Sequence, residues 1–437
     1  MLRLGPRSPG GVAGKFIGHV KRMTKAGGAR RVVVTGTGVV TPIGTTVNEF
    51  WDSIRHGRNG VTELGGFPLE DLKILIAAQI KNFDHKARLK NFKRDRLITM
   101  ADRYSWFAAV AADEAVRQAG LEVPFAKPYR AACIVGSGAG GLTTMETAYR
   151  DIFIHNKRAT HPLTLLRIIG SSAAAHVGIE FGVKGPTFAT CSACSTATHA
   201  IGIARDYIRD GVVDVAIAGA SESVISYGTM KAWQALHVLS PEGCFPFAKK
   251  RNGTVLADGA GILVLESLDH ARARGATILA ELSGYGMASD SQDMVKPTVE
   301  GPSVAMQMAL DDAGLKPEDI DYLNAHGTAT TDNDINETKA IKNVFGSHAY
   351  NLAISSTKSM TGHPLGAGGA IEAIACIKAM QENWAPPTMG LDEPGDECDL
   401  DYVPNVGRSM KVTNTMSNSF AFGGLNAVLV FTPPPAA

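Results

Sequence analysis

The chain has 437 residues, with 43 Lys and Arg against 42 Asp and Glu, so its formal net charge is +1. A chain this close to neutrality has no overall positive field, which excludes nucleic acid and anionic membranes as partners bound by bulk charge. Its 45% of hydrophobic residues is typical of a folded rather than a disordered chain. Glycine is the unusual residue: 47 copies are about 11% of the chain against about 7% on average, and glycine marks tight turns and close backbone contacts.

Cysteine usage and the apolar runs favour a cytoplasmic protein. Six cysteines are spread over the chain without the spacing of a secreted disulfide framework. No apolar run approaches the ~18–20 residues that span a bilayer.

The N-terminal segment differs from the rest because its first 48 residues contain basic residues but no Asp or Glu. One interpretation is an organellar transit segment, which would imply import. The other is a disordered extension, or a start codon assigned too early. We favour the second interpretation because no secretory-type apolar region is present, and we expect a basic extension over residues 1–30.

The predicted elements alternate between strands and helices from residue 31 onward. This alternation predicts a layered α/β fold. A helix is expected over 100–120, closed by Gly120, and a second over 303–314. Strands are expected over 31–40, 131–138, 213–220, 262–267, 277–286 and 320–327.

Two of these stretches resemble each other. EAVRQAGL and QMALDDAGL place Ala115 opposite Ala309 and Gly120 opposite Gly314. Each is preceded at some distance by a strand that contains Gly-x-Gly and is followed by a turn with proline. Chance similarity between amphipathic helices is the alternative. A duplication would divide the chain into halves over 31–268 and 269–437.

The strongest candidate for a nucleophile lies in the segment 184–211. A strand runs into Cys194, and a helix is predicted from there to Gly211. Backbone N–H groups at a helix N-terminus stabilise a thiolate, lower the thiol pKa and can hold an oxyanion. Two other interpretations remain open. Cys191 and Cys194 form a C-x-x-C pair that could be a redox couple, or Cys194 is a small buried residue in a close-packed turn.

Two histidines follow predicted strands in the second half. His326 lies in NAHGTAT, and His363 lies in SSTKSMTGH, five residues after Lys358. Polar residues at strand ends are held by a rigid sheet and are often functional. A lone histidine is more often structural, but two in similar contexts beside a helix-capping cysteine favour catalysis. A fourth segment, NSFAFGG, ends in a glycine turn whose amides can face a ligand.

Together, the four segments resemble the elongating β-ketoacyl-acyl-carrier-protein synthases. SACSTA, NAHGTAT, SSTKSMTGH and NSFAFGG occur in the family's order at family-like spacing, and the resemblance runs from about Arg31 to Phe431. The chain is most similar to the second synthase type and its nodulation-type condensing relatives. The resemblance implies the thiolase fold, with two βαβαβαββ halves in a five-layer αβαβα arrangement, and a homodimer.

The resemblance also implies a decarboxylative Claisen condensation. Cys194 would take the acyl chain from its carrier protein as a thioester. His326 and His363 would assist decarboxylation of malonyl-carrier protein and stabilise the enolate, which then attacks the thioester. A helix N-terminus and two N–H donors in a dry site suit these steps.

Other matched residues would support this reaction. Lys358 would hold the network around His363 through Glu337, and the amides of Cys194 and Phe422 would form an oxyanion hole. The resemblance implies no metal and no bound cofactor, because the phosphopantetheine arm arrives on the acyl carrier protein. Substrate contacts are expected at Ala139, Thr328, Thr330, Phe422 and Gly423.

An acidic carrier protein needs local positive charge on the enzyme, despite the neutral total. Two basic clusters are candidates for docking, and ordinary solvated surface is the alternative interpretation of both. The first cluster is Lys86, Arg88, Lys90, Lys93, Arg94 and Arg96, and the second is Lys157 with Arg158.

A non-catalytic partner subunit that sets chain length in a condensing heterodimer is the rival function. Such subunits generally lack the nucleophile, so Cys194 favours an enzyme. The paired histidines also favour an elongating synthase, because chain-initiating relatives would carry Asn in place of one of them.

The acyl tunnel is expected to be wide at Ala139, where relatives carry a larger aliphatic gate residue. Ala139→Ile should therefore reduce the longest primer that the enzyme elongates, measured by an elongation assay across primer lengths. An unchanged longest primer would contradict this hypothesis.

Overall fold

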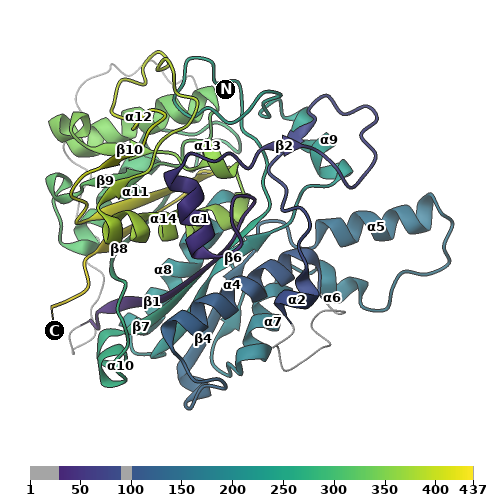
Figure 1. Cartoon of the computed structure of the whole chain (residues 1–437), viewed down its shortest axis with the longest axis horizontal. Helices are drawn as coiled ribbons and strands as arrows, with labels where there is room; N and C mark the ends of the chain where they lie inside the picture. The colour runs from purple at the N-terminus through teal and green to yellow at the C-terminus, as the bar shows by residue number, and fades with distance from the viewer. Residues whose placement is uncertain (1–28, 90–100, 437) are drawn as a thin grey trace, which may run out of the picture.

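A sheet of ten strands runs through the molecule and carries both halves of the chain (Figure 1). The computed structural model describes residues 29–89 and 101–436, so the predicted extension lies almost wholly outside the described residues. The sheet order is β10-β9-β13-β14-β8-β1-β7-β6-β4-β5. Its strands are β1 (Val32–Val40), β4 (Ala131–Gly136), β5 (Thr187–Phe188), β6 (Val215–Glu222), β7 (Gly259–Ser267), β8 (Ala280–Ser289), β9 (Tyr322–Asn324), β10 (Ala353–Ser355), β13 (Thr415–Ala421) and β14 (Leu425–Thr432). Two-stranded sheets pair β2 (Thr62–Glu63) with β3 (Ile76–Ala77) and β11 (Trp384–Ala385) with β12 (Arg408–Ser409).

The two halves of the large sheet repeat one arrangement. In the first half, β1 and β7 are antiparallel, β7 and β6 antiparallel, and β6, β4 and β5 parallel. In the second half, β8, β14, β13, β9 and β10 follow the same order of directions. The halves join where Val33 and Val34 of β1 pair with Glu281 and Ala280 of β8. The duplication expected from the sequence is confirmed, whereas the boundary at residue 269 stays a prediction.

Helices form three layers that enclose the two halves of the sheet (Figure 1). Helices α4 and α7 cover the outer face of the first half, and α11, with α12 beside it, covers that of the second. Helices α8 and α14 pack on each other and on strands of both halves, so they form the middle layer of the expected five-layer fold. Their bounds are α4 (Arg103–Ala119), α7 (Ser172–Phe181), α8 (Thr196–Arg209), α11 (Glu300–Ala313), α12 (Thr331–Phe345) and α14 (Gly368–Glu382). The other helices are α1 (Val47–Arg55), α2 (His85–Arg88), α5 (Leu142–Phe153), α6 (Thr164–Ile168), α9 (Tyr227–Ala235), α10 (Leu268–Ala273) and α13 (Lys358–Thr361).

The C-terminal segment departs from the sequence-based expectation. The pattern NSFAFGG predicts a glycine turn and no strand there, but most of this polar segment lies in β13, which is buried between β9 and β14. Its polar residues tolerate burial because they find partners: the Asn418 amide donates to Glu337 and the Ser419 hydroxyl lies 2.7 Å from that of Thr198.

Glycines in β1 and β8 let helices pack directly on the sheet. A Cβ at Gly38 would collide with the carbonyl of Ala111 on α4, and a Cβ at Gly286 would collide with the carbonyl of Ala305 on α11. The contacts are equivalent in the two halves, which explains the repeated Gly-x-Gly pattern.

We expect Gly38→Ala and Gly286→Ala each to lower the free energy of unfolding by about 1–3 kcal/mol, because the added methyl group must push helix and strand apart. Gly65→Ala is the matched control, since a Cβ there would meet nothing within 4 Å, and its effect should stay within about 0.5 kcal/mol. Urea unfolding measures all three. Equal losses at the three positions would contradict the packing argument.

Candidate active site

Cys194 lies in a tight turn at the start of the middle layer. The 3₁₀ turn η2 (Ala193–Ser195) leads directly into α8, so the helix predicted from Cys194 begins as expected. Ala193, the residue before the thiol, has φ 46°, a left-handed conformation that a residue with a Cβ rarely adopts. Strain of this kind is concentrated at functional sites. The Cys194 side chain is buried, with 7% of the residue exposed.

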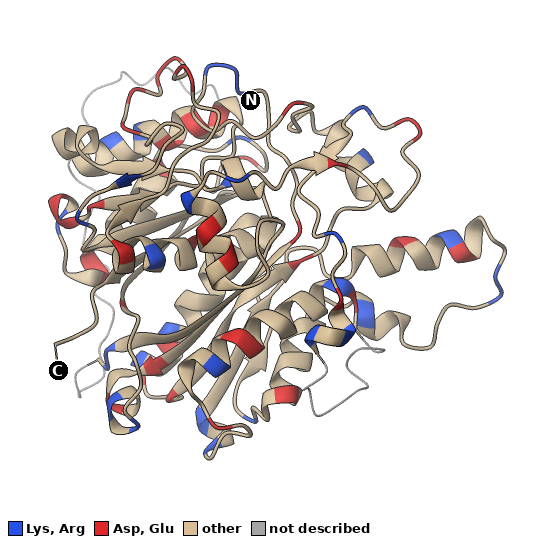
Figure 2. Ribbon diagram, in the orientation of Figure 1, with Lys and Arg blue, Asp and Glu red and all other residues tan. Residues whose placement is uncertain are grey.

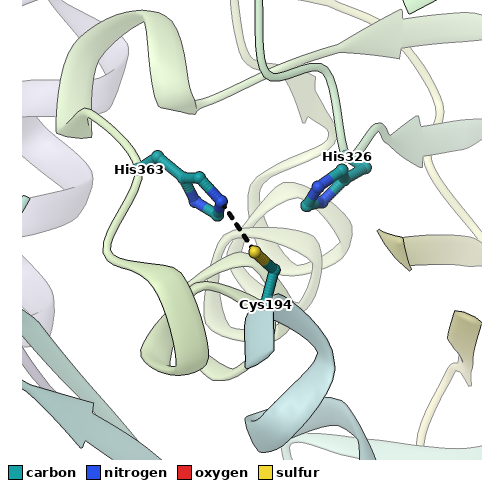
Figure 3. Close-up of side chains that lie close together, drawn as sticks. All are labelled: Cys194, His326 and His363. Carbon is teal, nitrogen blue, oxygen red and sulfur yellow. Dashed lines mark hydrogen bonds between the residues drawn. The ribbon is translucent and has the colours of Figure 1, made fainter. Parts of the chain in front are cut away.

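The two histidines reach the thiol from the second half of the chain (Figure 3). His326 follows β9, and His363 follows α13, where its backbone N–H donates to the carbonyl of Val255. His363 Nε2 lies 3.1 Å from Cys194 Sγ, a hydrogen-bond distance for sulfur. The two imidazole rings are 5.5 Å apart between centroids and nearly perpendicular, at 83°. One ligand atom from each of the three side chains lies within 4.8 Å of the others, so one reacting group can contact all three.

Burial keeps both histidines neutral. Desolvation lowers the pKa of His326 and of His363 well below the ordinary value, and the positive charge of Lys358 lowers both further. A neutral imidazole can donate a ring N–H to a developing negative charge without carrying a charge of its own.

The direction of the Cys194 pKa differs from the sequence-based expectation. A helix N-terminus was expected to lower it, but burial raises the pKa of the thiol to about 12. The charge of Lys358 and the backbone N–H of Phe422 act in the lowering direction without overcoming desolvation. Cys194 therefore rests as a thiol beside His363 rather than as a free thiolate.

Glu337 supports the loop of His326 rather than Lys358. Its carboxylate accepts the backbone N–H of His326 at 2.8 Å and that of Gly327 at 2.7 Å. Asn418 donates to the same carboxylate at 3.2 Å. The expected contact from Lys358 through Glu337 is thus wrong, because the Glu337 oxygens are used by backbone amides.

The buried partner of Lys358 is Glu372, on α14. The Lys358 ammonium donates to Glu372 Oε1, and both side chains are almost fully buried. Sequence reasoning missed Glu372, although a signal existed: it is the single charged residue in the apolar run GGAIEAIACI. A buried carboxylate in such a run needs a cationic partner.

A cavity of about 300 Å³ opens in front of the thiol. Phe422 forms part of its wall and stacks on Trp233 of α9 at 5.8 Å between ring centroids. No sequence pattern singled out Trp233, because the contact joins residues far apart in the chain. The residues predicted from the sequence that line this cavity are Cys194, His326, His363, Thr328, Thr330, Phe422 and Gly423.

The other predicted residues lie elsewhere. Ala139 is not in the lining of this cavity but packs in the apolar cluster that contains Cys194. Lys86 and Arg88 are on α2, and Lys157 and Arg158 are exposed beyond α5; none of the four lines the cavity. The remaining docking candidates, Lys90, Lys93, Arg94 and Arg96, lie outside the described residues.

The Cys–His–His set has donor types that also suit Zn²⁺. The nearby Lys358 ammonium, whose charge acts on all three side chains, opposes a second cation there. The absence of a metal requirement stays a prediction.

Comparison with known proteins gives one consistent family. The profile of "Beta-ketoacyl synthase, N-terminal domain" matches residues 29–271, and that of "Beta-ketoacyl synthase, C-terminal domain" matches residues 279–392. Nodulation protein E of Rhizobium meliloti (strain 1021) is 47% identical over 92% of this chain and 99% of its own length. The 3-oxoacyl-[acyl-carrier-protein] synthase 2 of Staphylococcus aureus (strain COL) is 42% identical over 92% of this chain and 98% of its own.

A solved structure agrees with these relatives. It is a type II PKS acyl-carrier protein in complex with its ketosynthase bound to the hexaketide, with a TM-score of 0.84 and 34% identity. The match covers 93% of this chain and 100% of that one. A thiol and two histidines in a duplicated, five-layer fold define the condensing enzymes of the thiolase fold. This chain belongs to the β-ketoacyl synthase family, acyltransferases that condense units during acyl-chain elongation.

The Lys358–Glu372 pair gives a test of the buried charges. Glu372→Gln and Lys358→Met should each lower the free energy of unfolding by about 3–5 kcal/mol, because each leaves one buried ion without its partner. The double variant Lys358→Met with Glu372→Gln should lose less than the sum of the two single variants, measured by urea unfolding. Losses that simply add in the double variant would show that the two groups do not interact.

Proposed function

We propose that the chain catalyses decarboxylative Claisen condensation of an acyl chain, held on Cys194, with malonyl-acyl-carrier protein. The observation that carries this proposal is the convergence of Cys194 Sγ, His326 and His363 on one cavity. The product is a β-ketoacyl-carrier protein, longer by two carbons.

In the first half-reaction, the acyl chain moves from its carrier to Cys194. The sulfur bonds to the acyl carbonyl carbon, the carrier thiolate leaves, and the proton of the Cys194 thiol ends on the departing sulfur. The backbone N–H of Phe422 is directed at the Cys194 thiol. We assign it, with the N–H of Cys194, to stabilise the negative oxygen of the tetrahedral intermediate.

In the second half-reaction, malonyl-carrier protein loses CO₂. The bond to the carboxylate carbon breaks, and its electron pair forms an enolate whose oxygen accepts hydrogen bonds from His326 and His363. The enolate carbon then attacks the acyl carbon, and Cys194 leaves as a thiolate that regains a proton. Lys358 and Glu337 act by positioning. The Lys358 ammonium lies near both imidazole rings, and the Glu337 carboxylate holds the His326 loop.

We propose an acyl carrier protein as the partner. The solved ketosynthase described above was captured with its acyl-carrier protein, and Thr328 and Thr330 line the cavity that a phosphopantetheine arm would enter.

The described parts of both basic clusters stay candidates for docking (Figure 2). Lys86 and Arg158 are exposed, whereas Arg88 donates to Thr45 and Lys157 pairs with Asp151 at 2.9 Å. Lys86 and Arg158 are therefore the freer positions.

Charge reversal at Lys86 or Arg158 should raise the KM for carrier-bound substrate and weaken the salt dependence of that KM. Unchanged kinetics would remove these residues from the docking surface.

We propose a homodimer because α5 extends from the body of the molecule with apolar residues in the open (Figure 1). Exposed apolar residues on neighbouring helices are often covered by a partner. Sedimentation as a single chain would contradict a second copy here. The exposed residues on and near α5 and α6 are Tyr149, Phe153, Ile154, Leu165, Leu166 and Ile169.

We place the protein in the cytoplasm, where cysteines stay reduced. All six cysteines are free, as expected in a reducing compartment, and cell fractionation tests this. Within residues 29–89 and 101–436, no helix is both long and apolar enough to span a bilayer.

Mass spectrometry after incubation with acyl-carrier protein tests the proposal. Wild type should gain the acyl mass on Cys194, and Cys194→Ala should gain none. Cys191→Ala is the matched control, since Cys191 is exposed, three residues away, and should leave acylation intact. Dependence on both cysteines would favour the redox alternative, and no acylation of wild type would favour the non-catalytic partner subunit.

A further inference from the structure

Glu222 is a fully buried carboxylate near the thiol that the reaction described above does not use. It is the last residue of β6 and has no exposed surface. Its negative charge acts on Cys194, in the direction that raises the thiol pKa. A buried carboxylate beside a nucleophile is unfavourable unless its contacts serve the site.

The contacts of Glu222 join two segments that are far apart in the chain. On one side, it accepts the backbone N–H of Gly138 and the hydroxyl of Ser137, the latter at 3.1 Å. On the other side, it accepts the backbone N–H of Gly366, three residues after His363. The loop of Gly138 carries Ala139, the expected wall of the acyl tunnel.

The turn around Gly366 is built to admit this carboxylate. A Cβ at Gly366 would collide with Glu222 Oε1, and a Cβ at Gly138 would lie 3.1 Å from the same oxygen. Gly138 also faces the nucleophile turn, because its carbonyl accepts a contact from Cys191 Sγ at 3.6 Å. The Glu222 carboxylate therefore lies where three segments meet: the loop of Gly138 and Ala139, the turn that carries Cys194, and the turn of Gly366 that follows His363.

We propose that Glu222 is a positioning residue, whose carboxylate holds the Ala139 loop and the turn after His363 in fixed register with Cys194. Its role is to keep the Ala139 loop and His363 aligned with Cys194 during acyl transfer. This inference rests on the proposed acylation of Cys194, and it adds a determinant of both acylation rate and chain length.

Two substitutions separate position from charge. Glu222→Asp keeps the charge but is one methylene shorter, so it cannot reach both segments. Glu222→Gln keeps the length but has one acceptor oxygen in place of two and removes the negative charge. Both should reduce the acylation rate of Cys194 at saturating acyl-carrier protein by about ten- to hundredfold, with little change in KM, and should alter the primer-length profile.

The pH profile of Cys194 alkylation by iodoacetamide, which needs no carrier protein, gives a readout of the charge. Glu222→Gln should move the profile to lower pH, because it removes a charge that opposes the thiolate, whereas Glu222→Asp should leave it in place. The other groups that act on the thiol remain the same in both variants. Those groups are Lys358, Glu372, His326, His363 and the backbone N–H of Phe422, and Tyr104 of α4 also faces Glu222.

Glu114→Gln is the matched control for general loss of stability. Glu114 also accepts two backbone N–H groups, those of Val39 at 3.0 Å and Val47 at 2.8 Å, but it lies on α4 away from the thiol. It should lower the melting temperature and leave acylation, primer profile and alkylation profile as in wild type.

The proposal is overturned if Cys194 of the Glu222→Gln variant is acylated at the wild-type rate, with the primer-length profile and the pH profile of alkylation unchanged. It is also overturned if Glu114→Gln reduces acylation as much as Glu222→Gln does. Ser137→Ala provides the decision if the Glu222 variants do not fold. It removes no charge, but it removes the hydroxyl that donates to Glu222 and accepts the backbone N–H groups of Ala139 and Gly140. A changed primer profile in Ser137→Ala supports the proposal, and an unchanged one opposes it. Alkylation in wild type without any acylation would instead refute the function proposed above.

Discussion

Burial of Cys194 and of the two histidines is the constraint on which the rest of the site depends. It raises the pKa of the thiol and lowers those of His326 and His363, so the three reacting side chains rest without charge. The ionisable groups that remain nearby must then be satisfied by the protein itself: Lys358 pairs with Glu372, and backbone amides bind Glu337. The same burial strengthens every hydrogen bond to a negative oxygen formed during the reaction.

The duplicated fold encloses the site by bringing together different catalytic residues from two halves of similar structure. The first half contributes the thiol at the start of a middle-layer helix. The second half contributes His326 after β9 and His363 after the short helix α13. Neither half encloses the site alone, because α8 and α14 pack on strands of both. The close contacts of Gly38 with Ala111 and of Gly286 with Ala305 keep the outer helices tight on the sheet.

Local sequence was enough to predict the alternating elements, the repeat and the three reacting side chains, because those signals lie within single segments. The other predicted residues that face the cavity came from the resemblance to a known family. The pairing of Lys358 with Glu372 was not predictable in this way, since it depends on how α14 packs on the sheet. The prediction that the pKa of Cys194 is lowered was wrong for a similar reason. A helix terminus can be recognised in a sequence, but the depth of burial of a side chain cannot. Strand β13 was missed because its polar residues find partners only in the folded sheet.

The turns before the two middle helices are equivalent under the duplication. Turn η2 begins at Ala193 with φ 46°, and turn η5 (Leu365–Ala367) begins at Leu365 with φ 42°, each directly before its helix. The second residue is Cys194 in one turn and Gly366 in the other. One strained backbone shape thus serves opposite purposes: it presents a side chain to the substrate in the first copy and makes room for a carboxylate in the second. At this pair of positions, the two halves of a nearly symmetric molecule therefore differ in function.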